Sequence, residues 1–159
     1  MPINVKYINP FIEAAQNVLR DMCGKEIKIG KLNIKSSPYT SSEVIVLIGL
    51  TGTIRGQVIF SIKKQVACNI ASAMMGGMEV KELDELSKSA ICELTNMILG
   101  NTASIFYNRG TTVDITPPSF LIGQDMQITS NDMQTISIPL EFVGTDDWFK
   151  IDVAIVEES

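Results

Sequence analysis

Apolar and polar residues alternate with helical spacing over residues 85–109, the longest such stretch in the chain. Apolar side chains recur there every three or four positions, as on one face of a helix, and no Pro interrupts them. The pattern therefore predicts one long helix. At about 100° per residue, its expected buried stripe consists of Leu83, Leu86, Ala90, Leu94, Met97 and Ile105.

A second stripe of the same helix combines two polar side chains with small residues. It consists of Ser89, Glu93, Asn96, Gly100 and Ala103. A Gly inside a helix costs about 1 kcal/mol relative to Ala, and small residues let another surface approach the backbone. Glu93 and Asn96 lie one turn apart and project side by side. The pattern leaves open whether Gly100 and Ala103 face a partner or pack against a neighbouring helix of the same chain.

The first part of the chain carries another long helix. Asn9 is its expected N-cap, Pro10 lies in its first turn, and Gly24 is its expected C-terminal cap. Its expected apolar stripe is Phe11, Ala14, Ala15, Val18, Leu19 and Met22. Glu13 and Gln16 nearly repeat the spacing of Glu93 and Asn96. Gln replaces Asn here, so we interpret this pair as structural or vestigial.

Period-two alternation and short apolar runs predict the strands. They are expected at residues 28–35, 43–50, 56–62, 111–115, 120–122, 135–143 and 149–156. The second and third should form an antiparallel hairpin at the centre of a sheet, because the run 43–50 is apolar on both faces. Pro139 removes a backbone donor from the strand 135–143, so we expect an edge or a bulge there. A polar loop containing Pro38 is expected at residues 36–42.

A shorter helix is expected at residues 63–75, ended by Gly76-Gly77. The flexible side chains of Met74, Met75 and Met78 should fill gaps in the core. All these elements predict an α+β fold, with two long helices and one short helix packed on a largely antiparallel sheet. A chain of 159 residues suits a single domain, residues 1–159, with a sizeable core.

Composition narrows the classes of function. The chain is 45% apolar with a formal net charge of −5 and carries no basic cluster, which argues against nucleic acid or an anionic membrane surface as partner. Its apolar runs are too short to span a bilayer, and nothing in residues 1–7 resembles a signal peptide. We therefore expect a cytoplasmic protein without membrane insertion.

The chain contains no His, which removes Ser-His and Cys-His machinery and most transition-metal sites. Cys23, Cys68 and Cys92 have no metal-ligand spacing and are expected to be reduced, partly buried thiols. Any chemistry must therefore rest on carboxylates, amides and hydroxyls, or on groups supplied by a partner.

The second stripe resembles the signature helix of the CheC/CheX/FliY family of chemotaxis phosphatases. That signature is Asp or Ser, three residues, Glu, two residues, Asn, with a Pro well downstream. Ser89, Glu93 and Asn96 match it, Gly100-Asn101 follow, and Pro117-Pro118 lie near the expected Pro, about one residue early. Only one copy is intact, so the chain most resembles the CheX branch of the family.

The resemblance implies a CheC-like fold and dephosphorylation of the aspartyl phosphate of a CheY-type response regulator. It implies that Asn96 orients the attacking water and that Glu93 engages a lysine of the regulator. Magnesium would be bound by the regulator, and no cofactor by this chain. Ser89 occupies the Asp/Ser position of the signature, and we interpret Gly100 and Ala103 as the clearance that lets the helix dock.

Two further expectations concern assembly and the alternative function. The resemblance implies a homodimer, and the apolar strand 135–143, placed at an edge by Pro139, would supply its contact. The alternative function is a non-enzymatic dimeric module with the same fold, which binds a response regulator or a flagellar motor component without turnover. The intact Glu93 and Asn96 favour the phosphatase.

Overall fold

The computed structural model describes residues 5–35, 39–129 and 134–157. Its helices are the 3-10 turn η1 (Val5–Tyr7) and α1 (Asn9–Cys23), α2 (Lys64–Met74) and α3 (Glu85–Asn108). Its strands are β1 (Ile27–Ile29), β2 (Asn33–Lys35), β3 (Tyr39–Thr40), β4 (Val44–Gly52), β5 (Ile54–Ile62), β6 (Val113–Ile115), β7 (Ser119–Ile122), β8 (Gln127–Ile128), β9 (Thr135–Phe142) and β10 (Trp148–Glu157).

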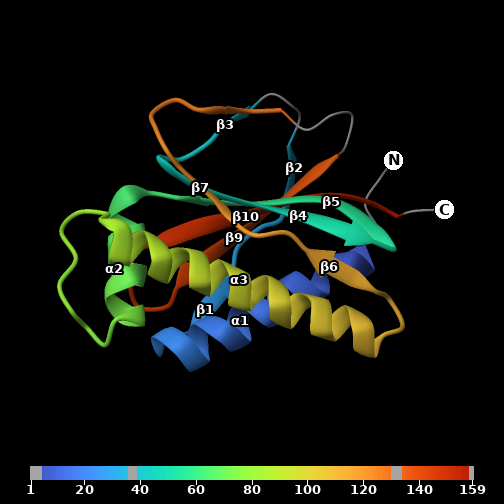
Figure 1. Cartoon of the computed structure of the whole chain (residues 1–159), viewed down its shortest axis with the longest axis horizontal. Helices are drawn as coiled ribbons and strands as arrows, with labels where there is room; N and C mark the ends of the chain where they lie inside the picture. The colour runs from blue at the N-terminus through green and yellow to red at the C-terminus, as the bar shows by residue number, and fades with distance from the viewer. Residues whose placement is uncertain (1–4, 36–38, 130–133, 158–159) are drawn as a thin grey trace.

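One antiparallel sheet forms the body of the fold. Its strand order is β1-β9-β10-β5-β4-β6, with β2 also paired to β9 and β7 also paired to β4. The helices lie on one side of this sheet, and the short β3–β8 pair lies on the other (Figure 1). This arrangement confirms the predicted α+β fold class, in which helices pack on an antiparallel sheet.

The predicted central hairpin is confirmed. β4 pairs with β5 and β5 with β10, so both strands are interior. Alternate residues such as Val46, Ile48 and Phe60 are buried in the same core as the apolar side chains of α1 and α3. The chain reverses between the two strands at Gly52, whose φ of 111° favours a residue without Cβ. Gly52 therefore belongs to the hairpin turn between β4 and β5.

Of the two alternatives expected at Pro139, the edge is wrong and the bulge is correct, because residues 30–32 of the neighbouring segment lie opposite only residues 138–139. β9 is paired on both sides, with β10 on one side and with β1 and β2 on the other. The missing N–H of Pro139 is accommodated instead by a break in the neighbouring strand, because residues 30–32 leave the ladder between β1 and β2. Gly30 donates to the Pro139 carbonyl at 2.9 Å, and a Cβ at Gly30 would lie 3.1 Å from the Pro139 Cβ. The strand expected at 28–35 is therefore two strands, and 135–143 does not supply the edge for a dimer.

Other differences are local. α1 includes Asn9 as its first residue, so Ile8 and not Asn9 occupies the N-cap position, while Gly24 at φ 63° is the C-terminal cap as predicted. Met22, expected in the buried stripe, is 42% exposed at the end of α1. Of the loop expected at 36–42, residues 36–38 with Pro38 lie outside the described residues, and Tyr39–Thr40 form β3.

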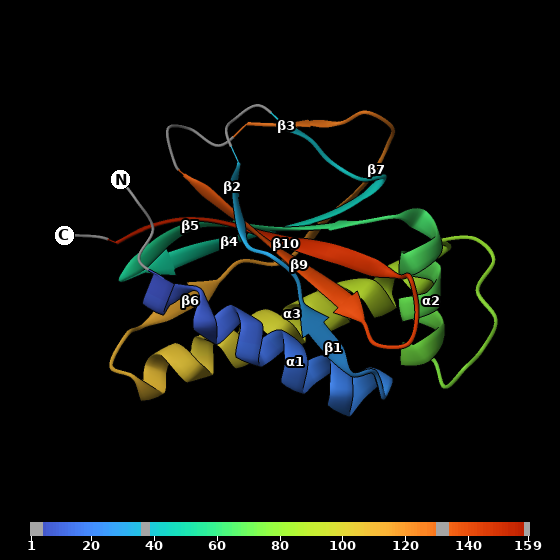
Figure 2. The same cartoon turned by 180° about the vertical axis from the view of Figure 1, so that it is seen from behind.

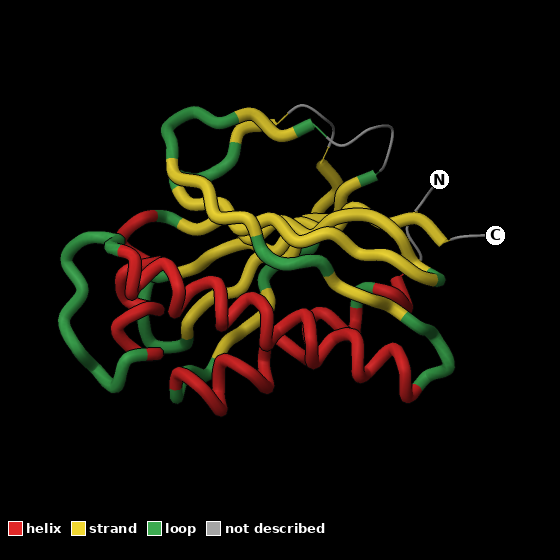
Figure 3. The backbone as a smooth tube through the Cα atoms, in the orientation of Figure 1, coloured by secondary structure: helices red, strands yellow, loops and turns green. Residues whose placement is uncertain are grey.

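The long helix α3 lies against α1 and α2 beneath the sheet (Figures 2 and 3). Phe106 of α3 meets Phe11 of α1 edge-to-face, with ring centroids 5.8 Å apart. None of the described helices is long and apolar enough to cross a membrane.

The buried stripe of α3 is rotated from the one expected. Its buried residues are Ser87, Ile91, Leu94, Thr95, Ile98, Leu99, Thr102 and Phe106. Of the expected stripe Leu94 is buried and Leu86 is 60% exposed. The other four, Leu83, Ala90, Met97 and Ile105, are partly buried against the core. The buried hydroxyls are satisfied within the helix, since Thr95 Oγ1 donates to the Cys92 carbonyl at 2.9 Å and Thr102 Oγ1 to that of Ile98 at 2.8 Å. This local bonding lets two threonines occupy a core face.

Candidate functional site

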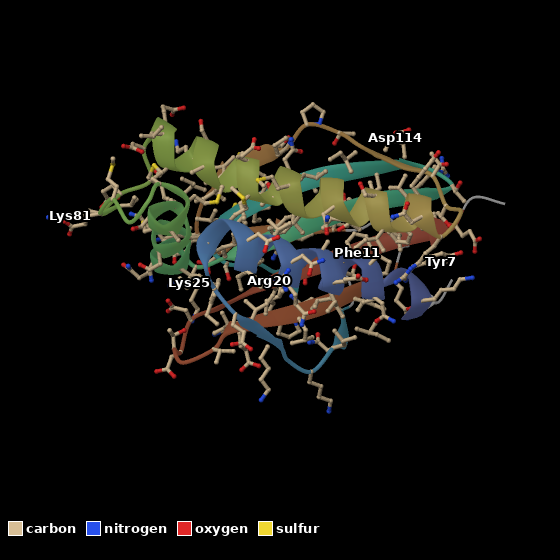
Figure 4. The ribbon with its side chains drawn as sticks, turned by 90° about the horizontal axis from the view of Figure 1, so that it is seen from below. Tyr7, Phe11, Arg20, Lys25, Lys81 and Asp114 are labelled. Carbon is tan, nitrogen blue, oxygen red and sulfur yellow. The ribbon has the colours of Figure 1, made fainter. Side chains whose placement is uncertain are left out.

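The stripe of Ser89, Glu93, Asn96, Gly100 and Ala103 lies on the side of α3 away from the core. Ser89 and Glu93 are exposed, and Asn96, Gly100 and Ala103 are partly exposed. Figure 4 views the two long helices from below, with the sheet behind them. The sequence-predicted residues are therefore brought together on one accessible helix face. We call this face the α3 stripe.

The start of α3 is held by a side-chain cap. The Asp84 carboxylate accepts hydrogen bonds from the Ser87 backbone N–H at 2.9 Å and from the Ser87 hydroxyl at 2.8 Å. The same bonds hold the pKa of Asp84 below its ordinary value, because they favour the ionised carboxylate. The negative charge also complements the N-terminal end of the helix dipole. The turn that precedes Ser89 is thus fixed.

Glu93 and Asn96 are available to a partner. Three residues apart on a helix, their Cβ atoms lie about 5–6 Å from each other. Within the described ranges, neither side chain makes a hydrogen bond or an ion pair. An exposed carboxylate and a half-exposed amide with unused donors and acceptors can bind groups brought from outside.

Gly100 lies beside open space. A Cβ built at this residue meets no described atom within 4 Å. The alternative that Gly100 packs against a neighbouring helix of the same chain therefore does not hold for the described residues. The helical cost of this Gly is not offset by packing inside the chain, which favours a role toward a partner that approaches the backbone closely.

The near-copy on α1 differs from the α3 stripe in its surroundings. Glu13 and Gln16 are both exposed on α1. Arg109 Nη2 lies 3.4 Å from Glu13 Oε2, so an ion pair between α1 and the end of α3 engages this carboxylate. Glu93 has no such partner among the described residues. The two carboxylates are therefore not equivalent, and Gln16 also lacks the geometry of an Asn.

The thiol next to the stripe is not activated. Burial raises the pKa of Cys92 above its ordinary value, so the group remains a neutral thiol near pH 7. Burial likewise raises the pKa of Cys23 and Cys68, and all three cysteines are free. Together with the lack of His, this leaves the α3 stripe suited to orienting a reactant rather than attacking it.

Two exposed apolar residues near the stripe were not expected. Leu86 was assigned to the buried stripe, and Met78 to core filling; they are 60% and 59% exposed. Leu86 lies seven residues before Glu93, which places both within about 20° of one direction on the helix. That seven-residue step is a signal in the sequence that could have linked Leu86 to the stripe.

Comparison with known proteins gives a consistent result. The family model described as "Chemotaxis phosphatase CheX" matches residues 44–141, a range that includes α3. The CheY-P phosphatase CheX of Thermotoga maritima is 36% identical over 146 residues, covering 92% of this chain and 94% of that protein.

Solved structures agree in fold over nearly the whole chain. A CheC-like superfamily protein from Shewanella sp. PV-4 superposes with a TM-score of 0.85 at 28% identity, covering 97% of this chain and 99% of that one. A chain of the CheX–CheY–BeF3–Mg²⁺ complex from Borrelia burgdorferi superposes with a TM-score of 0.78 at 32% identity, covering 95% of this chain and 98% of that one.

Proposed function

This chain belongs to the CheX family of chemotaxis phosphatases, and on that premise we propose that it hydrolyses the aspartyl phosphate of a CheY-type response regulator. The observation that carries the proposal is the α3 stripe, where Glu93 and Asn96 lie free beside the open space at Gly100. The T. maritima relative is named as a CheY-P phosphatase, which supports the same activity here.

Asn96 orients the attacking water. An amide does not titrate in the useful range, so it cannot be a general base, but its N–H donor and its carbonyl acceptor can hold one water in a fixed direction. Hydrolysis of a phosphoryl group passes through a loose transition state that demands positioning and charge neutralisation more than covalent chemistry. A single amide that holds the water in line with the bond that breaks is therefore sufficient for a large effect.

Glu93 binds a lysine of the regulator near the phosphoryl group. Its carboxylate is exposed and has no partner among the described residues, so it can form a charge-assisted contact without first breaking another. Fixing that lysine orients the regulator relative to Asn96. Ser89, Gly100 and Ala103 have small side chains along the same face, so the regulator can approach the α3 backbone.

The magnesium ion belongs to the regulator in this proposal. It neutralises charge on the phosphoryl oxygens, which Glu93 and Asn96 do not do. The B. burgdorferi complex is named with CheY, BeF3 and Mg²⁺, and these components support a partner that brings both a phosphoryl site and the metal. The proposal also places the chain in the cytoplasm, together with its substrate.

Phosphate release tests the proposal directly. A CheY-type regulator is phosphorylated with a small phosphodonor, the donor is removed, and inorganic phosphate is followed with and without this protein. We expect the protein to accelerate release at a catalytic ratio to regulator. Binding without acceleration would instead identify the non-enzymatic interaction module.

A further inference from the structure

A pocket lies at the N-terminal end of α3, next to the α3 stripe. It has a volume of about 310 Å³, and its apolar lining comes from Met75, Met78, Val80 and Leu86. We call it the Met78–Leu86 pocket. Lys81, labelled in Figure 4, marks the loop between α2 and α3 that forms one wall. Gly76 and Gly77, with φ of 71° and 91°, turn the chain sharply between Met75 and Met78.

Two of the apolar side chains of this pocket are exposed, while Met75 and Val80 are partly buried against the core. Met78 is 59% and Leu86 60% exposed. Single exposed apolar residues are ordinary on a protein surface, whereas several gathered around one hollow mark an interaction site. Methionine adapts its shape to varied neighbours, which suits a contact surface.

The charged residues around the pocket are already partnered. Glu82 Oε2 lies 2.8 Å from Lys64 Nζ, and Glu79 Oε1 lies 4.0 Å from Lys81 Nζ. The Asp84 carboxylate is engaged by Ser87 at the start of α3. Both ion pairs are exposed and contribute little, so the exposed apolar side chains of Met78 and Leu86 define the group that fits the pocket, an apolar side chain.

The pocket lies near the α3 stripe, because Leu86, which lines it, is a residue of α3. Leu86 and Glu93 share one direction on the helix, and ten residues separate Leu86 from Asn96, a rise of about 15 Å. A standard protein interface buries about 800 Å² on each partner, a patch roughly 30 Å across. A regulator docked over Glu93 and Asn96 therefore extends over the pocket as well.

We propose that the Met78–Leu86 pocket receives an apolar side chain of the response regulator and so contributes to the choice of regulator. This inference rests on the proposed function, because the α3 stripe sets where the regulator lies. Glu93 and Asn96 meet the phosphorylation site, whose chemistry all such regulators share. The pocket meets surface outside that site, where regulators can differ from one another, and this is where selectivity arises.

Steady-state dephosphorylation tests the pocket with Met78→Gln, Leu86→Gln and the double variant. Gln has nearly the size of these side chains and adds a polar amide, and at Leu86 it also keeps the helix propensity. We expect each single change to raise KM about fivefold to tenfold and the double variant to raise it further, with kcat within twofold of wild type. Leu86→Met keeps an apolar side chain and should retain the wild-type KM.

Ile34→Gln is the matched control. Ile34 is 63% exposed on β2 and does not line the Met78–Leu86 pocket, so the KM of Ile34→Gln should equal that of wild type. If Met78→Gln and Leu86→Gln behave like this control while wild type is active, the pocket inference is wrong and the proposed function stands. A wild-type protein that never accelerates phosphate release would overturn both. A change of sedimentation mass in these variants, with KM unchanged, would assign the pocket to a second copy of the chain and overturn the inference.

Discussion

Asp84 and Ser87 close the first turn of α3 through three hydrogen bonds. Asp84 Oδ1 accepts from the Ser87 N–H and hydroxyl at 2.9 and 2.8 Å, and the hydroxyl also lies 3.0 Å from the Asp84 carbonyl. Ser87 is fully buried, so these bonds also satisfy its hydroxyl within the core. The cap thus defines where α3 begins, at Glu85, four residues before Ser89.

Asp84→Ala should lower the melting temperature measurably, because it removes the carboxylate that accepts from the Ser87 backbone N–H. The pKa of Asp84 is held below its ordinary value of 3.8, so its contribution is fully present above that pH and is lost as pH falls through the lower folded value. Melting of both proteins at pH 7 and at pH 2–3 checks this. The difference between them should shrink in acid, and a difference that grows there would contradict the role of the ionised cap.

A buried ion pair lies on the face of the sheet away from the helices. Lys35 Nζ lies 3.4 Å from Asp152 Oδ2, and the two side chains are 16% and 0% exposed. Asp152→Asn removes one charge and leaves the other beneath the surface, so we expect a loss of about 3 kcal/mol in the free energy of unfolding. Urea unfolding measures it. Asp21→Asn is the control, since Asp21 pairs with Arg20 at 65% exposure on both sides and should cost less than about 0.5 kcal/mol.

The homodimer remains a prediction, but its expected contact moves from the strand 135–143 to another strand. β9 is interior, whereas the edge strand β7 exposes Leu121 (47%) and Ile122 (50%), which point to opposite faces. We predict a symmetric homodimer with this edge at its contact, of twice the 17.4 kDa chain mass. Sedimentation at micromolar concentration measures it, and Ile122→Lys should shift the protein toward monomer. A monomeric wild-type mass would contradict the prediction.

The elements with strong periodicity were predictable from the sequence. The helix α3, the cap at Gly24 and the β4–β5 hairpin follow from patterns that only one local structure satisfies. The rotation of α3 about its axis was not predictable in the same way. Ile91, Leu99 and Phe106 extend its apolar surface over more than half of the circumference, so the spacing alone cannot select the buried direction.

Features that depend on which strands are neighbours could not be predicted from the pattern of one sequence either. The missing N–H of Pro139 is compatible with an edge and with a bulge. Only the neighbouring segment shows which of the two occurs, because its pairing is interrupted from Gly30 onward, opposite Pro139. The two-residue strands β3 and β8 are too short to give a period. The α3 stripe was predictable because its polar and small residues distinguish it from the rest of the helix, whichever direction of the helix is buried.

Glu93→Ala tests the contact with the lysine of the regulator. We expect binding of the phosphorylated regulator to weaken by an amount on the order of 1–3 kcal/mol, more at low salt than at high salt because the attraction is screened. Titration calorimetry with a beryllofluoride-loaded regulator at two ionic strengths measures it. An affinity that is unchanged at low salt would exclude an ionic role for Glu93.

Gln16→Ala on α1 is the control for the choice of helix. Gln16 is exposed and lies on the near-copy whose Glu13 pairs with Arg109, so its removal should change neither affinity nor turnover. A large loss of turnover in this variant would move the site from α3 to α1.

Single-turnover hydrolysis of a phosphorylated regulator by Asn96→Ala tests the central claim most directly. If Asn96 acts only when water attacks, the interaction it makes belongs to the transition state. We therefore predict that the hydrolysis rate falls by at least about 100-fold while affinity for the regulator stays within a few-fold of wild type. Full hydrolysis by Asn96→Ala would contradict the proposed function.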